Sequence, residues 1–418
     1  GDPTENARVW RSQAKDSPER SSSVRQVVPS AEPWSFQPVG AFVRSADEVS
    51  VYWTAFAPSA EMGPVGPASA PSPNDPRGPL GPEAVQDVRL THIVTVAASG
   101  RRVRLKLSNT HGAEPVRIGG LSIEHNGARH LARFDGTPSV VIPAGASWLS
   151  DPLDLTVEAL DALAVSIDLP ERTRLPTHRW RQTLTNADGS TGQPMRLGVL
   201  LSAVEVESAF RPGVIVAFGD SITEGTGALP GGAGGWPERL ARRMVEAKRP
   251  WAVVNLGIGG NRLLHRGSGP SGLERLDADA LAQSGARCLI LLEGVNDIGR
   301  PSLAAYAHQR VEAAQLIAAY RQVIQRTRAA GLKAVLATIP PFEGASYFTA
   351  EGETTRAAVN QWLRQQSEAD GLIDFDAVLR DPQAPSRMRQ AFHSGDWLHP
   401  SDAGYQAMAE AIPRDVCG

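Results

Sequence analysis

The chain has 418 residues, and its 42 basic and 45 acidic residues give a formal net charge of -3. This length exceeds one ordinary domain and predicts two, while the near balance of charge argues against nucleic acid as a partner. No uninterrupted apolar run approaches the roughly 20 residues that a membrane-spanning helix needs, so no membrane span is expected.

The two cysteines, Cys288 and Cys417, exclude a disulfide-rich scaffold and a cysteine-rich metal site. Whether they form a single disulfide stays open at this point. The chain begins at Gly1, which fits either a processed exported protein or a sequence trimmed for expression. Together with the two-domain organisation, this start favours a secreted or periplasmic protein. Nothing in the sequence indicates an oligomeric state.

The N-terminal part of the chain has no sustained hydrophobic period. Residues 1–35 are polar and predict an extended arm. Residues 49–53 open a β-rich region, and residues 58–82, which are rich in Pro, Gly, Ser and Ala, predict a long surface loop.

Short strands with turn residues between them, and no helical patterns, dominate the next part of the chain. They are predicted at residues 92–96, 103–107, 116–123, 139–142 and 163–169. Strands at this spacing predict a β-sandwich, resembling a jelly roll, over residues 36–206. Residues 205–213 form a short connector to the second domain.

From Gly213 the pattern changes to strand, helix, strand, which predicts an α/β domain over residues 207–418. Strands are predicted at residues 214–218, 253–256, 288–292, 333–339 and 372–375, and helices at 236–247, around 316–324 and around 359–363. The apolar run 214–218 reads as a strand that is buried on both faces, as in a parallel sheet covered by helices.

Residues that could take part in catalysis follow three of these strands. Ser221, Gly259 and Asn296 come shortly after the first, second and third strand of this domain. Because the carboxyl ends of parallel strands meet at one edge of a sheet, we expect these residues to converge there. A serine needs a base and oxyanion donors to act as a nucleophile on a carbonyl.

A second group of polar residues lies near the C-terminus, where Asp396 precedes His399 by three residues. Pro400 disfavours helix at His399, which predicts a loop just before a final helix capped by Ser401 or Asp402. An imidazole with a carboxylate beside it is the base that a nucleophilic serine requires.

Four ordered blocks make the chain similar to the SGNH (GDSL) hydrolases. They are Gly219-Asp220-Ser221, Gly259, Gly294-Val295-Asn296-Asp297 and Asp396-Trp397-Leu398-His399. The resemblance covers residues 213–413 and points to a bacterial two-domain subgroup with an N-terminal β-domain. It implies a flavodoxin-like three-layer α/β/α domain with a parallel sheet, and a serine esterase mechanism without a metal or another cofactor.

Carried over residue by residue, the resemblance implies that Ser221 is the nucleophile, His399 the general base and Asp396 the group that orients His399. The oxyanion hole would combine the backbone N–H groups of Ser221 and Gly259 with the side chain of Asn296. Further residues in the loops around the site are expected to contact the substrate. They are Asp220, Trp236, Asn261, Arg262 and Trp397.

Structural roles are the alternatives for the same residues. Ser221 could cap a helix, Asn296 could satisfy a turn, and Asp220 and Asp297 could hold loops through hydrogen bonds. The residues expected to contact the substrate could equally be scaffold. The other histidines are expected to be structural or solvated, and they are His92, His111, His125, His130, His178, His265 and His393.

The leading hypothesis for function is a serine ester hydrolase that removes short acyl groups, such as O-acetyl groups of a polysaccharide. A small-molecule or polysaccharide ester is the partner it implies. Within the family, a lysophospholipase, a thioesterase or an aryl esterase is the alternative. From another class, the alternative is a carbohydrate-binding protein whose hydrolase domain is vestigial.

Overall fold

A computed structural model describes residues 36–39, 81–96, 98–175, 179–207, 213–229 and 232–418. These residues belong to Ser35–Gly418, one of the two compact units into which the chain divides. The expected arm at 1–35, the predicted strand at 49–53 and nearly all of the expected loop at 58–82 lie outside the described residues. The predicted domain limits 36–206 and 207–418 stay predictions.

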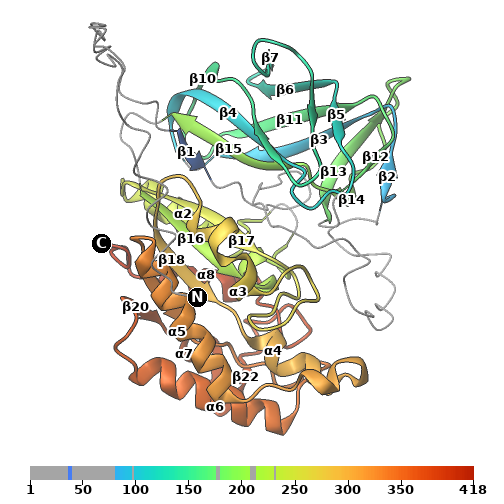
Figure 1. Cartoon of the computed structure of the whole chain (residues 1–418). Coiled ribbons are helices and arrows are strands. Elements are labelled where there is room, and N and C mark those ends of the chain that lie inside the picture. The colour runs from blue at the N-terminus through green and yellow to red at the C-terminus, as the bar shows by residue number, and fades with distance from the viewer. Residues whose placement is uncertain (1–35, 40–80, 97, 176–178, 208–212, 230–231) are drawn as a thin grey trace, which may run out of the picture. The chain divides into compact units, whose positions relative to one another are not determined.

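The first part of the described chain is β-rich, with two larger antiparallel sheets (Figure 1). One sheet has the order β1 (Phe36–Val39), β15 (Leu201–Glu207), β4 (Gly100–Ser108) and β10 (Leu153–Val157), with β9 (Ser147–Leu149) on β4. The other has the order β14 (Met195–Gly198), β13 (Arg179–Asn186), β3 (Val88–Thr95), β11 (Ala162–Leu169), β6 (Gly120–His125) and β7 (Ala128–Leu131). Two short pairs join β2 (Ala84–Val85) with β12 (Thr173–Arg174) and β5 (Val116–Ile118) with β8 (Val140–Ile142).

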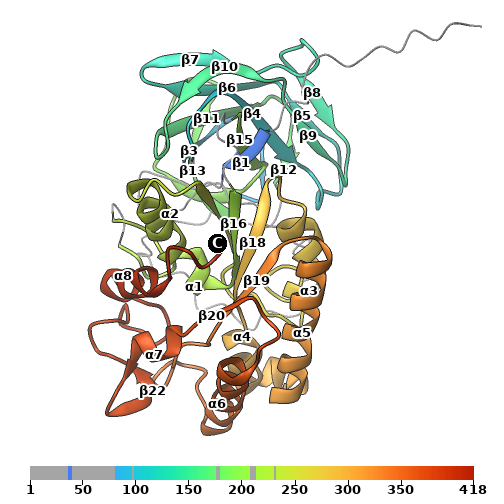
Figure 2. The ribbon, with the colours of Figure 1, turned by 90° about the vertical axis from the view of Figure 1, so that its left-hand side faces the viewer.

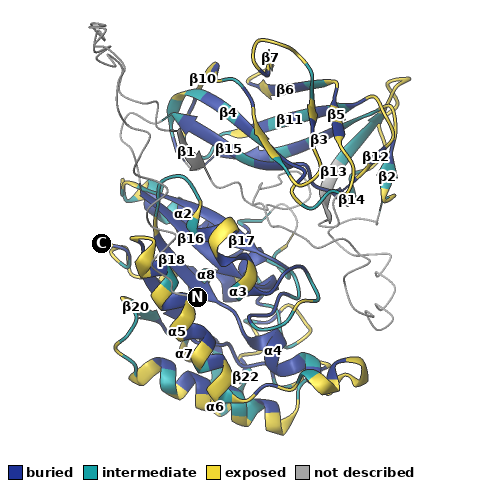
Figure 3. Ribbon diagram, viewed as in Figure 1, coloured by how far each residue is buried: buried dark blue, intermediate teal, exposed yellow. Residues whose placement is uncertain are grey.

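Several strands of this β-rich region, among them β4, β10 and β11, alternate between buried and more exposed residues (Figure 3). In β4, Val103 and Leu105 are fully buried while Arg104 between them is half-buried, which is the period of two that a half-buried strand has. The single strand predicted at 116–123 is wrong in one respect, because β5 ends before Gly119 and β6 begins after it. That the two larger sheets form a sandwich stays a prediction.

The second part is built on a five-stranded parallel sheet, as the fold-class prediction requires. Its strands are β16 (Gly213–Gly219), β17 (Trp251–Gly257), β18 (Ala286–Leu292), β19 (Lys333–Ala337) and β20 (Gly371–Ile373). The order across the sheet is β17-β16-β18-β19-β20. Numbered from the first strand of this sheet, the order is 2-1-3-4-5, which is the flavodoxin-like arrangement.

Helices cover both faces of this sheet (Figure 2). On one side lie α2 (Trp236–Glu246), α7 (Phe375–Leu379) and α8 (Asp402–Ala411), and on the other lie α3 (Gly272–Arg275) and α5 (Ala313–Ala329). The remaining helices are α1 (Ser221–Glu224), the π-helix η2 (Leu276–Leu281), α4 (Val295–Gly299), the 3₁₀ helices η3 (Arg300–Ser302) and η4 (Ala304–Gln309), and α6 (Ala350–Gln365). A small hairpin joins β21 (Arg380–Asp381) and β22 (Ala384–Met388).

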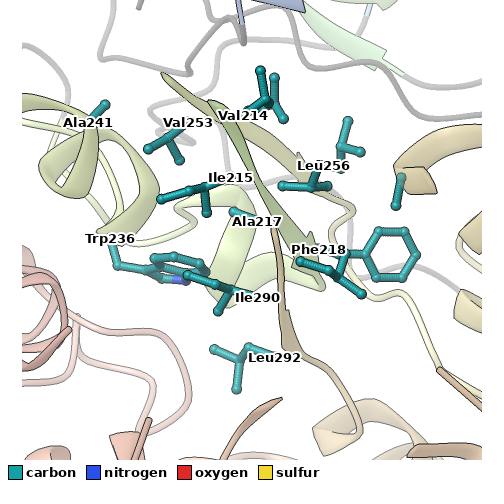
Figure 4. Packing of buried hydrophobic residues seen from close by; sticks show 14 of the residues in the cluster. Val214, Ile215, Ala217, Phe218, Trp236, Ala241, Val253, Leu256, Ile290 and Leu292 are labelled. Carbon is teal, nitrogen blue, oxygen red and sulfur yellow. The ribbon is translucent and has the colours of Figure 1, made fainter. Parts of the chain in front are cut away.

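The central strand β16 forms the middle of the core. All residues from Val214 to Phe218 are fully buried. Figure 4 shows four of them, Val214, Ile215, Ala217 and Phe218, among side chains of the neighbouring strands and of α2. This strand is therefore covered on both faces, as its continuous apolar run predicts. Cys288 in β18 forms a disulfide with Cys417, which settles the question that the sequence leaves open. Among the described residues, no helix is both long and apolar enough to cross a membrane.

Candidate active site

Three strands of the parallel sheet end at the same level. Gly219 of β16 pairs with Gly257 of β17 on one side and with Leu292 of β18 on the other. Ser221 and Gly259 each follow their strand by two residues. The register of the sheet thus brings the loops that carry the candidate residues to one edge, as expected for parallel strands.

Ser221 is the first residue of α1 and follows Asp220, which caps the helix. The Oδ1 atom of Asp220 accepts a hydrogen bond of 2.9 Å from the N–H of Ile222, the usual role of an N-cap aspartate. Burial raises the pKa of Asp220 to about 7 despite this hydrogen bond. Only 1% of Asp220 is exposed. Its observed role is therefore to cap α1, and the structure offers no support for contact with a substrate.

A chain of hydrogen bonds joins Ser221, His399 and Asp396. The Oγ of Ser221 lies 2.8 Å from the Nε2 of His399, and the Nδ1 of His399 lies 2.5 Å from the Oδ2 of Asp396. Ser221 and His399 are 178 positions apart in the sequence. His399 lies between the end of β22 and the N-cap Ser401 of α8, in the loop that Pro400 predicts.

The carboxylate of Asp396 is held by the backbone of its own turn. Its Oδ1 atom accepts hydrogen bonds of 2.9 Å from the N–H groups of Leu398 and His399. Partial burial alone would raise its pKa, but the hydrogen bond and charge of His399 and these two N–H groups hold the pKa of Asp396 well below its ordinary value. Asp396 therefore stays ionised beside the imidazole at neutral pH.

A second, buried histidine, His393, accepts hydrogen bonds from the backbone of the same turn. The Nδ1 atom of His393 accepts hydrogen bonds from the N–H of Gly395, at 3.0 Å, and from the N–H of Trp397, at 3.3 Å. The rings of His393 and Trp397 stack with their centroids 3.8 Å apart. This agrees with the expectation that His393 is structural, although its role in shaping the turn of Asp396 carries no signal in the sequence.

The groups suited to stabilise an oxyanion lie on the Ser221 side of the site. Within the described residues, the N–H groups of Ser221 and Gly259 are not engaged in hydrogen bonds. A Cβ at residue 259 would lie 2.7 Å from the Oε2 of Glu224, so only glycine fits there without a shift. Two free donors at the sheet edge can bind a developing negative charge.

The side-chain amide of Asn296 is fixed in orientation by two neighbours. Its Nδ2 donates a hydrogen bond of 3.0 Å to the carbonyl of Asn261, and its Oδ1 accepts one of 3.1 Å from the hydroxyl of Tyr347. Because an amide nitrogen carries two hydrogens, one donor of Asn296 remains for another acceptor. Tyr347, which orients this amide, is a residue that the sequence analysis misses.

Asp297, next to Asn296, holds a loop. Its two carboxylate oxygens accept hydrogen bonds from the N–H groups of Leu263 and Leu264, at 2.7 and 2.9 Å. Burial raises the pKa of Asp297 to about 6 although these bonds oppose the shift. The structure thus places Asp297 in the loop-holding role considered for it.

Three of the residues expected to contact the substrate are buried in the scaffold. Trp236 packs against Phe375 with ring centroids 5.7 Å apart. Asn261 donates to the carbonyls of residues 268 and 270, and Arg262 donates to Gln309. Each is at most 1% exposed, so the expectation of substrate contact is not supported for them. Trp397 is half-buried and lies two residues before His399 in the chain.

A buried arginine that the sequence analysis misses ties the sheet edge together. Arg275 donates to the carbonyls of Gly219, at 2.9 Å, and Leu256, at 3.0 Å, and to the side chain of Asn261, at 3.0 Å. Its guanidinium also lies over the ring of Phe218. One fully buried side chain therefore links the ends of β16 and β17 to the loop that follows Gly259.

Within the described ranges, no group of three or more His, Cys, Asp or Glu side chains is arranged to hold a metal ion. The arrangement at the sheet edge consists of a hydroxyl, an imidazole and a carboxylate in sequence, with N–H donors beside the hydroxyl. Chemically, this set can transfer a proton from the hydroxyl and bind an oxyanion.

Residues 217–407 match the model of the GDSL-like Lipase/Acylhydrolase family. A search of the curated proteins finds no match.

Several solved structures are similar to half of the chain. One is a lipolytic protein of the G-D-S-L family from Desulfitobacterium hafniense, with 21% identity over 49% of this chain and 98% of that chain and a TM-score of 0.37. Another is an acetylxylan esterase from Geobacillus stearothermophilus, with 21% identity over 49% of this chain and 94% of that chain and a TM-score of 0.38. A third is an acylhydrolase from Bacteroides fragilis, with 17% identity over 49% and 86% and a TM-score of 0.36.

Proposed function

Since residues 217–407 make this chain a member of the GDSL-like lipase/acylhydrolase family, and thereby a carboxylic ester hydrolase, we propose that Ser221, His399 and Asp396 are its catalytic triad. The observation that carries the proposal is the pair of hydrogen bonds from Ser221 to His399, at 2.8 Å, and from His399 to Asp396, at 2.5 Å. A hydroxyl within reach of an imidazole that a carboxylate orients is the arrangement that activates a serine.

In the proposed reaction, the Oγ of Ser221 attacks the ester carbonyl while its proton passes to the Nε2 of His399. The tetrahedral intermediate then collapses, and His399 gives this proton to the departing alcohol. Water attacks the resulting acyl-serine with His399 again as the base, which releases the acid and restores the serine. The ionised Asp396 stabilises the imidazolium formed in both halves of the reaction.

The oxyanion of each tetrahedral intermediate would bind to the N–H groups of Ser221 and Gly259 and to the free amide hydrogen of Asn296. These donors are held before the substrate arrives, because the amide of Asn296 is already fixed by Asn261 and Tyr347. Loss of one such donor typically costs about 2.7–4 kcal/mol of transition-state stabilisation.

We also propose a short acyl group on a hydrophilic alcohol, such as an O-acetyl group on a carbohydrate, as the substrate. Residues Ser394, Gly395 and Asp396, which lie just before His399, are exposed and polar or small. Such surroundings favour a hydrated sugar over a lipid chain. A preference for acyl chains of eight or more carbons in an ester chain-length series would instead favour the lysophospholipase or thioesterase alternative.

The proposed compartment is outside the cytoplasm. The disulfide between Cys288 and Cys417 supports it, because structural disulfides persist in oxidising compartments and are rare in the cytosol.

The test of the proposed triad is Ser221→Ala with 4-nitrophenyl acetate as substrate. We expect kcat to fall by at least about 10⁴-fold, since the nucleophile is lost, while the unfolding midpoint stays close to that of the wild type. Ser367→Ala is the matched control, because Ser367 is exposed and lies just after α6, which carries no residue of the proposed site. Undiminished turnover by Ser221→Ala would rule out the proposed nucleophile. A wild type that turns over no ester but binds polysaccharide would favour the carbohydrate-binding alternative.

A further inference from the structure

Arg300 is a charged residue next to the proposed site. It takes no part in the proposed reaction, and no sequence motif marks it. It directly follows α4, the short helix that carries Asn296, and its N–H donates a hydrogen bond to the carbonyl of Asn296. Residues four apart in a helical turn lie on the same face. The side chains of Asn296 and Arg300 thus leave the helix on one side.

That side of the helix faces the loop of Gly259. The amide of Asn296 donates to the carbonyl of Asn261, and a Cβ on Gly260 would clash with the guanidinium of Arg300. Asn296 and Arg300 therefore contact consecutive residues of the loop that supplies a proposed oxyanion donor. The guanidinium of Arg300 thus lies against Gly260, the residue that directly follows Gly259.

The charge of Arg300 is not neutralised in the described part of the chain. The one polar contact of its guanidinium there is with the Oγ of Ser268, at 3.4 Å, and the guanidinium lies 5.6 Å from the centre of the Tyr306 ring. No carboxylate of the described residues lies within ion-pair distance of it, whereas Arg310, ten residues on, pairs with Glu351 at 2.7 Å. Arg300 is half-buried and so remains reachable from solvent.

A neighbouring arginine shows the contrast. Arg262 lies near the same ring, 5.2 Å from its centre, but it is 1% exposed and donates to Gln309 and to the carbonyl of Arg266. Arg262 is therefore part of the scaffold. Arg300 keeps donors that are open to a ligand, and a guanidinium in this state binds a planar carboxylate through two parallel hydrogen bonds.

We propose that Arg300 forms an anion subsite beside the oxyanion donors, and that it selects esters whose acyl or alcohol part carries a carboxylate. This inference rests on the proposed function and narrows its substrate class to esters of acidic molecules, such as O-acetylated uronic acids. Arg300 is then a specificity-determining residue that holds the substrate and takes no part in proton transfer.

The experiment compares two matched pairs of phenolic esters. The first pair, 4-acetoxybenzoate and its methyl ester, differs in charge on the alcohol side, and the second, phenyl hydrogen succinate and its methyl ester, differs on the acyl side. In both pairs the release of the phenol is followed. The readout is the ratio of kcat/KM for the anionic ester to kcat/KM for its neutral partner.

We expect the wild type to prefer the anionic ester in at least one pair, and Arg300→Gln to lower that ratio by about tenfold or more. Arg300→Lys should retain part of the preference because it keeps the charge but loses the two-pronged geometry. Arg310→Gln is the matched control and should leave both ratios and the turnover of phenyl acetate as in the wild type. Raising the salt concentration should reduce the preference of the wild type, since charge attraction is screened.

The inference is overturned if the wild type shows no anionic preference in either pair, or if Arg300→Gln lowers both members of a pair equally. The latter outcome would give Arg300 a structural role only. Either result leaves the proposed function intact as long as the wild type turns over phenyl acetate. If it does not, the proposed function fails first and this subsite fails with it.

Discussion

The Ser221 side of the proposed site lies in buried loops at the end of the parallel sheet, whereas the His399 side lies on an exposed turn. Asp220 is 1% exposed and Asn296 is 5% exposed, but the side chain of Asp396 is 48% exposed. The Ser221 side is held by hydrogen bonds between distant parts of the chain, such as those of Arg275. The turn of Asp396 is held mostly by bonds within residues 393–399.

This difference separates stability from catalysis. Substitutions of the buried side chains that hold the Ser221 side, such as Arg275, remove bonds that several strands share, so they should lower the free energy of unfolding. Substitutions in the turn remove few bonds of the fold, so they should lower turnover and leave the fold intact. The three predictions below test this contrast, beginning with the largest expected effect.

Asp396→Asn should lower kcat for 4-nitrophenyl acetate by about 10³–10⁴-fold, because the amide no longer stabilises the imidazolium of His399. The free energy of unfolding, measured with urea, should fall less than for Arg275→Met, since the Asp396 side chain is half exposed and an asparagine keeps the backbone contacts of Oδ1. A large loss of stability together with activity would contradict the contrast. A loss of activity below tenfold would contradict the role of Asp396.

Arg275→Met should lower the free energy of unfolding by about 3–5 kcal/mol, the usual effect of removing one member of a buried charged network. The substitution leaves the carbonyls of Gly219 and Leu256 without their donor. Urea unfolding followed by circular dichroism measures the effect. Arg310→Met is the control, because Arg310 is exposed and pairs with the exposed Glu351. Equal stabilities of the two variants would show that Arg275 does not tie the sheet edge.

Asp220→Asn should change how stability depends on pH. Burial raises the pKa of Asp220 to about 7, against about 3.9 in an unfolded chain. The folded protein therefore binds the extra proton between these values. The contribution of Asp220 to stability is full below about pH 4 and is lost as the pH rises through about 7, with a slope of up to about 1.4 kcal/mol per pH unit.

The variant should lack this slope, because asparagine keeps the helix cap but does not titrate. Urea unfolding at several pH values between 4.5 and 8 measures it, with Asp135→Asn, at an exposed turn position, as the control. Identical pH profiles for Asp220→Asn and the wild type would mean that water reaches this carboxylate and that the Ser221 side is less buried than described.

The same contrast decides what could be predicted from the sequence. Strand β16 was predictable because five consecutive apolar residues leave few alternatives to a strand buried on both faces. The convergence of Ser221, Gly259 and Asn296 followed from the rule that parallel strands end at one edge. The loop position of His399 followed from Pro400, a local signal.

The interactions that hold these segments were not predictable. Arg275 bonds to two backbone carbonyls, and any residue supplies a carbonyl, so no pattern in the sequence marks its partners. Asn261 and Arg262 lie in a loop, where polar residues are usually exposed, but here they fill the interior of that loop. Arg300 was missed because its significance depends on Gly260 and on the absence of an acidic neighbour in space among the described residues.

The disulfide joins Cys288 and Cys417 across a sequence separation of 129. The ring that it closes contains Asn296, Arg300, Asp396 and His399 but leaves Ser221 outside. In the oxidised unfolded chain, the base and the amide donor thus belong to one closed loop whose conformational freedom is already reduced. Such closure is worth about 4.7 kcal/mol for a ring of 100 residues in the chain-entropy account. Thiol reagents therefore offer a means of loosening the tether between the C-terminal tail and β18 without altering any residue of the proposed triad.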